Sequence, residues 1–335
     1  MTDWLHLLEE VLYFCKDFLS KKDFPTAIQN FISDLISYKT ELSLNVENNL
    51  DEAMQFQNLV IEEQRKKVSK LIELPVDSIS YTQRNTIRSL GVALEKYGSL
   101  LADRNNASCM DFYQEALCMY EHINDQNAQS TIAISIGNVY FQIPSLYDLD
   151  QAIYWYEKSL NLTENIDMLV QAHALNSIAN VYSRKFMDVL RMNKSEEKVL
   201  NLANKALKKY EEVLELLKTL PHIGHPLPVH DLGIAYNGIG CIYGNLGQLD
   251  EALPYYQESI QCFEQSEDYN NAAMTRYNVA IDLYRYPEQG RLEEALLYAE
   301  SAMREALKHG NHTKGVAERS EKLIHEIQEK LKEGP

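Results

Sequence analysis

The sequence predicts an all-α protein built from stacked antiparallel helix pairs, and two observations support this fold class. The first is composition: 9 Pro and 13 Gly in 335 residues are too few for a sandwich or barrel with many short turns. Stretches that alternate apolar and polar residues, as half-buried strands do, are also scarce. The second is a spaced pattern of small and aromatic residues that recurs along the chain.

This pattern is clearest in residues 235–259, which read AYNGIGCIYGNLGQLDEALPYYQES. The first helix of each pair carries a small residue, and these residues are spaced by 46, 42, 61 and 40 positions: Gly91, Gly137, Ala179, Gly240 and Ala280. Gly costs about 0.5–1 kcal/mol relative to Ala inside a helix, so close approach of another helix must compensate. We expect each small residue to face the second helix of its own pair.

The unequal spacings are expected to arise in the turns between the two helices of a pair. The pattern assigns IPSLYD, YPEQG and, as the longest, RKFMDVLRMNKSE to such turns. A stacked helical array tolerates these differences, because its turns leave along one edge.

In these features the chain resembles the tetratricopeptide repeat (TPR) family over about residues 80–310. The family's frame is a large residue, a Leu-Gly pair, an aromatic residue and three small or aromatic positions in the second helix. YNGIGCIYGNLGQLDEALPYYQES matches nearly all of it except the closing proline. The resemblance implies a right-handed superhelical solenoid of antiparallel helix pairs whose inner, concave surface is lined by the first helices.

The ends of the chain lie outside this frame. Residues 1–75 are expected to form an N-terminal three-helix element: a degenerate hairpin at 15–36 and a long helix at 48–74, capped near Asn49 and ended by Pro75. The TPR array of about five hairpins then covers 78–310, and 311–335 supplies a C-terminal capping helix. The Pro- and His-containing segment 220–231 interrupts the array.

The net charge is −17, from 49 acidic and 32 basic residues, and no basic stripe is evident. Nucleic acid and membrane are therefore not expected as partners. The acidic start of the sequence lacks the basic region of a signal peptide, and an odd number of cysteines without CxxC spacing fits a reducing compartment. We expect a cytoplasmic protein, with homo-oligomers an open alternative.

Motifs for chemistry are absent from the sequence. His222, His225, His230 and Asp231 lie close together, but no cysteine is near them and helical HExxH spacing is missing. All five cysteines fall on predicted packing faces. We expect no catalytic residue, no metal and no cofactor, and hence a protein that is not an enzyme.

The predicted inner surface carries four asparagines, which can each bind the N–H and C=O of an extended backbone. TPR proteins that hold extended peptides, kinesin light chain among them, use asparagines in this way, and the resemblance extends that role to Asn138, Asn176, Asn180 and Asn237. The other predicted groove residues are Arg88, Arg184, Tyr277 and Arg285. The alternatives remain open that the amides bond to neighbouring helices and that the arginines form salt bridges. The lysines of chaperone-tail-binding TPRs are not matched.

Three functions are compatible with this pattern. The first is a non-enzymatic interaction module, scaffold or regulator, that binds an extended peptide segment of a partner protein. The second is a peptide-sensing switch, because a three-helix element before a TPR array resembles the bacterial Rap-type receptors. The third is regulation of a separate enzyme, such as a caspase-like protease.

Overall fold

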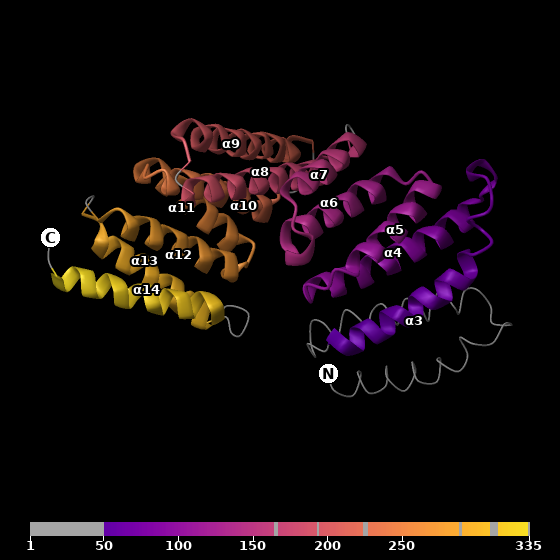
Figure 1. Cartoon of the computed structure of the whole chain (residues 1–335), viewed down its shortest axis with the longest axis horizontal. Helices are drawn as coiled ribbons and strands as arrows, with labels where there is room; N and C mark the ends of the chain where they lie inside the picture. Colours follow the sequence, from indigo (N-terminus) through magenta and orange to yellow (C-terminus); the bar gives the residue numbers. More distant parts are fainter. Residues whose placement is uncertain are drawn as a thin grey trace. The chain divides into compact units, whose positions relative to one another are not determined.

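The structure, a computed structural model, describes residues 50–163, 167–192, 194–223, 227–287, 290–308 and 314–333. Every regular element in these ranges is helical, which confirms the all-α prediction. The α-helices are α3 (Leu50–Val68), α4 (Tyr81–Asp103), α5 (Cys109–His122), α6 (Gln126–Gln142), α7 (Leu149–Thr163), α8 (Met168–Arg191), α9 (Glu196–Thr219), α10 (Val229–Asn245), α11 (Leu249–Gln265), α12 (Tyr269–Arg285), α13 (Leu292–Lys308) and α14 (Lys314–Glu333). The predicted hairpin at 15–36 lies outside the described residues (Figure 1).

The chain divides into two compact units, one up to Leu162 and one from Thr163 onwards. The first contains α3 to α7 and the second α8 to α14. This division falls inside the predicted array, and the predicted domain boundaries near residues 75 and 310 stay predictions.

In the first unit, consecutive helices from α3 to α6 pack on one another. The Ser80 side chain accepts a bond from the Gln83 backbone while the Gln83 side chain accepts one from the Ser80 backbone, a capping box that starts α4. The helix predicted at 48–74 ends earlier, at Val68. The chain turns there because Leu71 and Leu74 leave the helix to pack against the core of this unit.

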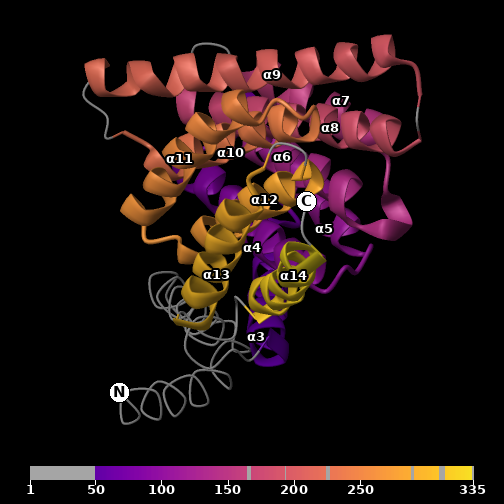
Figure 2. The same ribbon diagram turned by 90° about the vertical axis from the view of Figure 1, so that its left-hand side faces the viewer.

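In the second unit, consecutive helices again pack as neighbours, and α8, α10, α12 and α14 also contact one another in that order. Figure 2 shows this part of the chain from its C-terminal side. We call the face of the second unit that these four helices form the first-helix row. Contacts between neighbours along the row are typical of a TPR-type array, in which each first helix lies beside the next.

The small residues lie where the sequence predicts. A Cβ added at Gly91, Gly137 or Gly240 would lie 2.5–2.7 Å from the ring of Tyr120, Tyr156 or Tyr256, each on the second helix of the same pair. Ala179 and Ala280 are completely buried. Close packing therefore offsets the low helix propensity of these glycines.

α10 contains a second glycine contact, on the side of the preceding pair. A Cβ at Gly238 would lie 2.5 Å from the hydroxyl oxygen of Tyr210 on α9. Consecutive pairs thus press tyrosines into α10 from both sides, which explains why one short helix carries several glycines.

The assignment of RKFMDVLRMNKSE to a turn is wrong. α8 continues to Arg191 and α9 begins at Glu196, so both helices have 24 residues where α10 and α11 have 17. The reason is that Phe186 is completely buried, and Val189 and Leu190 pack against the same core. The 61-residue spacing therefore comes mainly from longer helices, and the rest comes from the longer connection between α9 and α10.

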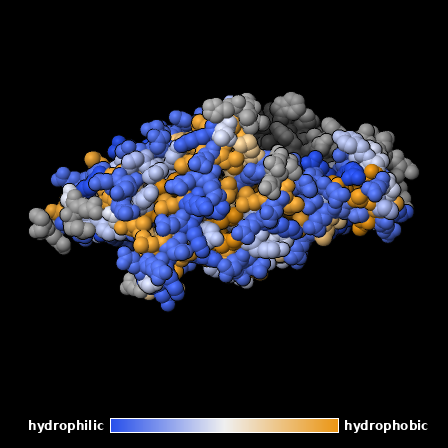
Figure 3. Space-filling model, turned by 90° about the horizontal axis from the view of Figure 1, so that it is seen from above, coloured by the Kyte–Doolittle hydropathy of each residue, from blue (hydrophilic) through white to orange (hydrophobic). Residues whose placement is uncertain are grey.

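The predicted C-terminal helix is present as α14. Ser320, completely buried, follows Ala280 by 40 residues, the spacing of the preceding repeat, so α14 takes the place of another first helix. Seen from above, the surface is mostly hydrophilic, with strips of apolar atoms between polar side chains (Figure 3). That distribution is expected of amphipathic helices packed side by side.

Candidate functional site

Four buried tyrosines of second helices end on polar side chains of first helices. Tyr120, Tyr156, Tyr210 and Tyr256 are each 1% exposed. Their hydroxyls donate to Glu95 (3.0 Å), Asn138 (2.7 Å), Asn180 (2.6 Å) and Asp282 (2.7 Å), respectively. A buried hydroxyl without a partner is costly, so these acceptors satisfy a requirement of the core.

In two of the predicted groove asparagines, only the oxygen of the side-chain amide is bonded to a neighbouring helix. Asn138 and Asn180 are half-buried, and each uses its Oδ1 to accept the tyrosine hydroxyl. The amide nitrogen of each side chain is thereby oriented as a donor. Neighbouring helices thus use one of the hydrogen bonds that each amide could offer to a ligand.

Asn237 joins α10 to α12. Its Oδ1 accepts a bond from Asn278 Nδ2 at 3.2 Å, and the same nitrogen lies 3.5 Å from Cys241 Sγ. Further along the two helices, Arg285 Nη1 donates to Asn245 Oδ1 at 2.8 Å. We call Asn237, Asn278, Asn245 and Arg285 the amide seam. It places half-buried amides on two adjacent helices of the first-helix row.

Asn176 differs from the other predicted asparagines. It is 5% exposed, and neither atom of its amide group has a hydrogen-bond partner within the described part of the chain. A buried polar group without a partner costs about 1–3 kcal/mol.

The predicted arginines are all paired with carboxylates. Arg88 Nε lies 2.9 Å from Asp125, Arg184 Nε 3.6 Å from Asp188, and Arg285 Nη1 3.1 Å from Asp282. These pairs neutralise the three arginines that the sequence offers for recognition of acidic groups.

Tyr277 contacts a residue that the sequence reasoning missed. The guanidinium of Arg319, on α14, lies 5.4 Å from the centre of the Tyr277 ring. Asn278 was missed as well. Continuing the 40-residue spacing from Ala280 to Ser320 would have revealed α14 as another first helix, and hence Arg319 as a residue of the row.

A buried carboxyl group lies beneath the amide seam. Burial raises the pKa of Asp282 to about 6, although the bonds from Tyr256 and Arg285 favour the charged form. Burial, with Asp282 adding to it, raises the pKa of the Cys241 thiol to about 12. A thiol that stays protonated at neutral pH is a poor nucleophile, so the seam is better suited to hydrogen bonding than to nucleophilic chemistry.

Two of the other described cysteines, Cys109 and Cys262, are buried in the core. Burial raises the pKa of Cys109 and of Cys262. Cys118 is exposed, which contradicts its assignment to a packing face. It lies beside the buried stripe of α5, which runs through Tyr113 and Ala116 to Tyr120.

The histidines near the 220–231 segment form pairs in the structure. His173 lies 3.0 Å from Asp231, and His230 lies 3.0 Å from Asp268. The bond to Asp231 raises the pKa of His173. No group of three or more His, Cys, Asp or Glu side chains with the geometry of a metal site occurs among the described residues. Within the same residues, no helix is long and apolar enough to span a bilayer.

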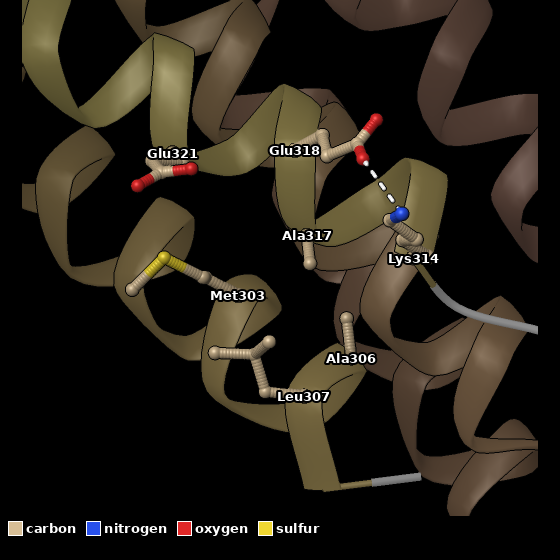
Figure 4. A pocket seen from close by; sticks show the side chains of 7 residues that line it. All are labelled: Met303, Ala306, Leu307, Lys314, Ala317, Glu318 and Glu321. Atoms are coloured by element: carbon tan, nitrogen blue, oxygen red, sulfur yellow. Dashed lines mark ion pairs between the residues drawn. The ribbon is translucent and has the colours of Figure 1, made fainter. Parts of the chain in front are cut away.

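A hollow of about 440 Å³ lies between α13 and α14 (Figure 4). It is lined by Met303, Ala306, Leu307, Lys314, Ala317, Glu318 and Glu321. Lys314 and Glu318 form an ion pair with one another at 3.8 Å, at its edge. The hollow is half open and holds no convergent set of polar groups, so the amide seam is the stronger candidate for binding.

Comparison with known proteins identifies the repeat. Residues 231–307 match the sequence profile of the tetratricopeptide repeat family. This stretch is a TPR segment. It covers α10 to α13, and with them the whole amide seam.

One solved structure shares the fold of most of this chain, and a second matches it less well. The crystal structure of BtubC (BKLC) from P. vanneervenii matches with a TM-score of 0.54 at 16% identity, covering 78% of this chain and 93% of that one. The Rap conjugation gene regulator of the plasmid pLS20, solved in complex with a peptide, matches with a TM-score of 0.44 at 13% identity, covering 92% and 79%. The first match shows a common TPR-type fold, and nothing further rests on the second. No curated protein matches this chain.

Proposed function

We propose that this chain is a non-enzymatic interaction module that binds an extended peptide segment of a partner protein along the first-helix row. The observation that carries the proposal is the amide seam. Asn237 and Asn278 bond to one another through one atom each. This bond leaves Asn237 Nδ2 as a donor and Asn278 Oδ1 as an acceptor, the two groups that a peptide backbone requires.

Asn180 extends this arrangement to α8. Because its Oδ1 accepts the Tyr210 hydroxyl, its Nδ2 is the group that bonds to a peptide carbonyl. Neighbouring helix axes lie about 8–10 Å apart, and an extended chain advances about 3.3 Å per residue. A bound segment thus contacts a new helix about every three residues. The fixed seam reduces the ordering cost of binding.

Two matched variants test the proposal. Random dodecapeptides displayed on phage are selected on the full chain, and an enriched peptide is titrated by fluorescence anisotropy. We expect the Asn237→Ala, Asn278→Ala double variant to bind about tenfold more weakly, a loss of about 1.4 kcal/mol. The control is Asn201→Ala, an exposed asparagine on α9, which keeps the wild-type affinity. Equal affinity for wild type and the double variant would remove the seam from the binding site.

The peptide-sensing switch and the regulation of a separate enzyme remain predictions. The switch depends on N-terminal helices that lie largely outside the described residues. No described residue favours an enzyme as the partner over any other protein.

A further inference from the structure

Two cations of α14 lie over tyrosines of α12. Arg319 lies 5.4 Å from the centre of the Tyr277 ring, and Lys330 lies 4.9 Å from that of Tyr284. Tyr277 and Tyr284 are seven residues apart, two helical turns, so they share one side of α12. Both pairs therefore lie along the contact between α12 and α14, at the last position of the first-helix row.

Neither cation has a carboxylate partner among the described side chains. Two carboxylates near them on α14 are engaged elsewhere, Glu318 with Lys314 and Glu326 with Lys322. On α12, Asp282 is buried and paired with Arg285. Arg319 and Lys330 therefore differ from the three predicted arginines, each of which is paired with a carboxylate. Within the described part of the chain they are unpaired positive charges, in a protein whose net charge is −17.

Arg319 is held in place with donors to spare. Its Nε donates to the Gly315 carbonyl at 2.9 Å, and its Nη2 lies 3.8 Å from Met274 Sδ. A guanidinium has five N–H donors, so three remain for a bidentate bond to a carboxylate. The Tyr277 ring beneath the guanidinium and the bond to the Gly315 carbonyl hold Arg319 near α12 before any ligand arrives.

We propose that Arg319 and Lys330 recognise two acidic side chains of the bound peptide, so that the partner's segment is acidic at the end that crosses α12 and α14. The inference rests on the proposed function. Tyr277 precedes Asn278, so the amide seam on one side of α12 leads directly to the two cations on the other. Arg319 and Lys330 are 11 residues apart on α14, a rise of about 16 Å, which corresponds to acidic residues about five positions apart in an extended chain.

The test repeats the dodecapeptide selection on four full-length proteins: wild type, Arg319→Gln/Lys330→Gln, Lys322→Gln and Asn237→Ala/Asn278→Ala. Lys322→Gln removes one exposed charge of α14 that is paired with Glu326 and serves as the control. We expect wild type and Lys322→Gln to enrich peptides with two acidic residues about five positions apart. Arg319→Gln/Lys330→Gln still enriches peptides but without that acidic preference.

One enriched peptide and its Glu→Gln counterpart are then titrated against the wild type and Arg319→Gln/Lys330→Gln. The wild type should prefer the acidic form about tenfold, less so at high salt, and the double variant should not distinguish the two. Thermal melting confirms that each variant is folded. An acidic preference that survives in the double variant, or enriched peptides that are not acidic, would overturn this inference while leaving the amide seam intact. A wild type that enriches no peptide would overturn the proposed function itself.

Discussion

Replacing Gly240 by alanine tests whether close helix packing explains the glycines of the repeat. The new Cβ would lie 2.7 Å from Cδ1 and 2.9 Å from Cε1 of Tyr256. That ring has nowhere to move, because it is 1% exposed and its hydroxyl is bonded to Asp282 at 2.7 Å. The substitution must therefore strain the core even though alanine is the better helix former.

The expected size follows from three contributions. Overpacking of a filled core costs about 1–3 kcal/mol. Weakening of the Tyr256 bond adds about 1 kcal/mol, and the gain in helix propensity returns about 1 kcal/mol. Gly240→Ala should thus lower the free energy of unfolding by about 2 kcal/mol.

Urea unfolding followed by far-UV circular dichroism measures this change, provided that the slopes of the transitions match. The matched control is Gly315→Ala on α14, where an added Cβ meets nothing within 4 Å. Only the propensity term acts there, so this variant should be more stable by up to about 0.5–1 kcal/mol. If Gly240→Ala were as stabilising as Gly315→Ala, close approach would not be the reason for the glycine.

Three further predictions concern the core and its charges. Phe186→Ala should destabilise the second unit by about 3–5 kcal/mol in urea, while Met192→Ala at an exposed position should change little, because residues up to 191 form a packed helix. Burial raises the pKa of Asp282 to about 6 in the folded chain, so its contribution to stability is full below its unfolded pKa near 4 and is lost as pH rises through 6. The urea midpoint of the wild type should therefore fall between about pH 4 and 6. The midpoint of Asp282→Asn should lack this decrease. The raised pKa of His173 gives stability that is present below about pH 6.5 and lost above it, and an unchanged pH profile in His173→Gln would contradict the pairing with Asp231.

The pair geometry of the array is predictable from the sequence because its signal is local. A glycine in a helix is costly wherever it stands, so Gly91, Gly137 and Gly240 mark close contacts without knowledge of the partner ring. The extended α8 is different. The repeat frame predicts a turn at residues 184–196, although Phe186, Val189 and Leu190 have the spacing of a buried helix face.

The binding face is only partly predictable for the same reason. Spacing places Asn138 and Asn180 on a face of their helices, but it does not reveal that a tyrosine hydroxyl 18 or 30 residues further along already occupies one atom of each amide. Likewise, Tyr277 is predictable as a surface residue of the row, whereas its cation comes from a helix in which the sequence reasoning saw no repeat. Tertiary neighbours decide which polar atoms remain for a ligand.

Among the four buried tyrosines, Tyr256 differs in the helix to which its hydroxyl is bonded. Tyr120, Tyr156 and Tyr210 bond within their own pair, whereas Tyr256 packs on α10 of its own pair and bonds forward to Asp282 of the next. One side chain thus ties three successive helices together directly beneath the amide seam. Together with the Asn278–Asn237 and Arg285–Asn245 bonds, this hydroxyl fixes α12 against the hairpin before it, so the surface of the amide seam is built by two repeats jointly.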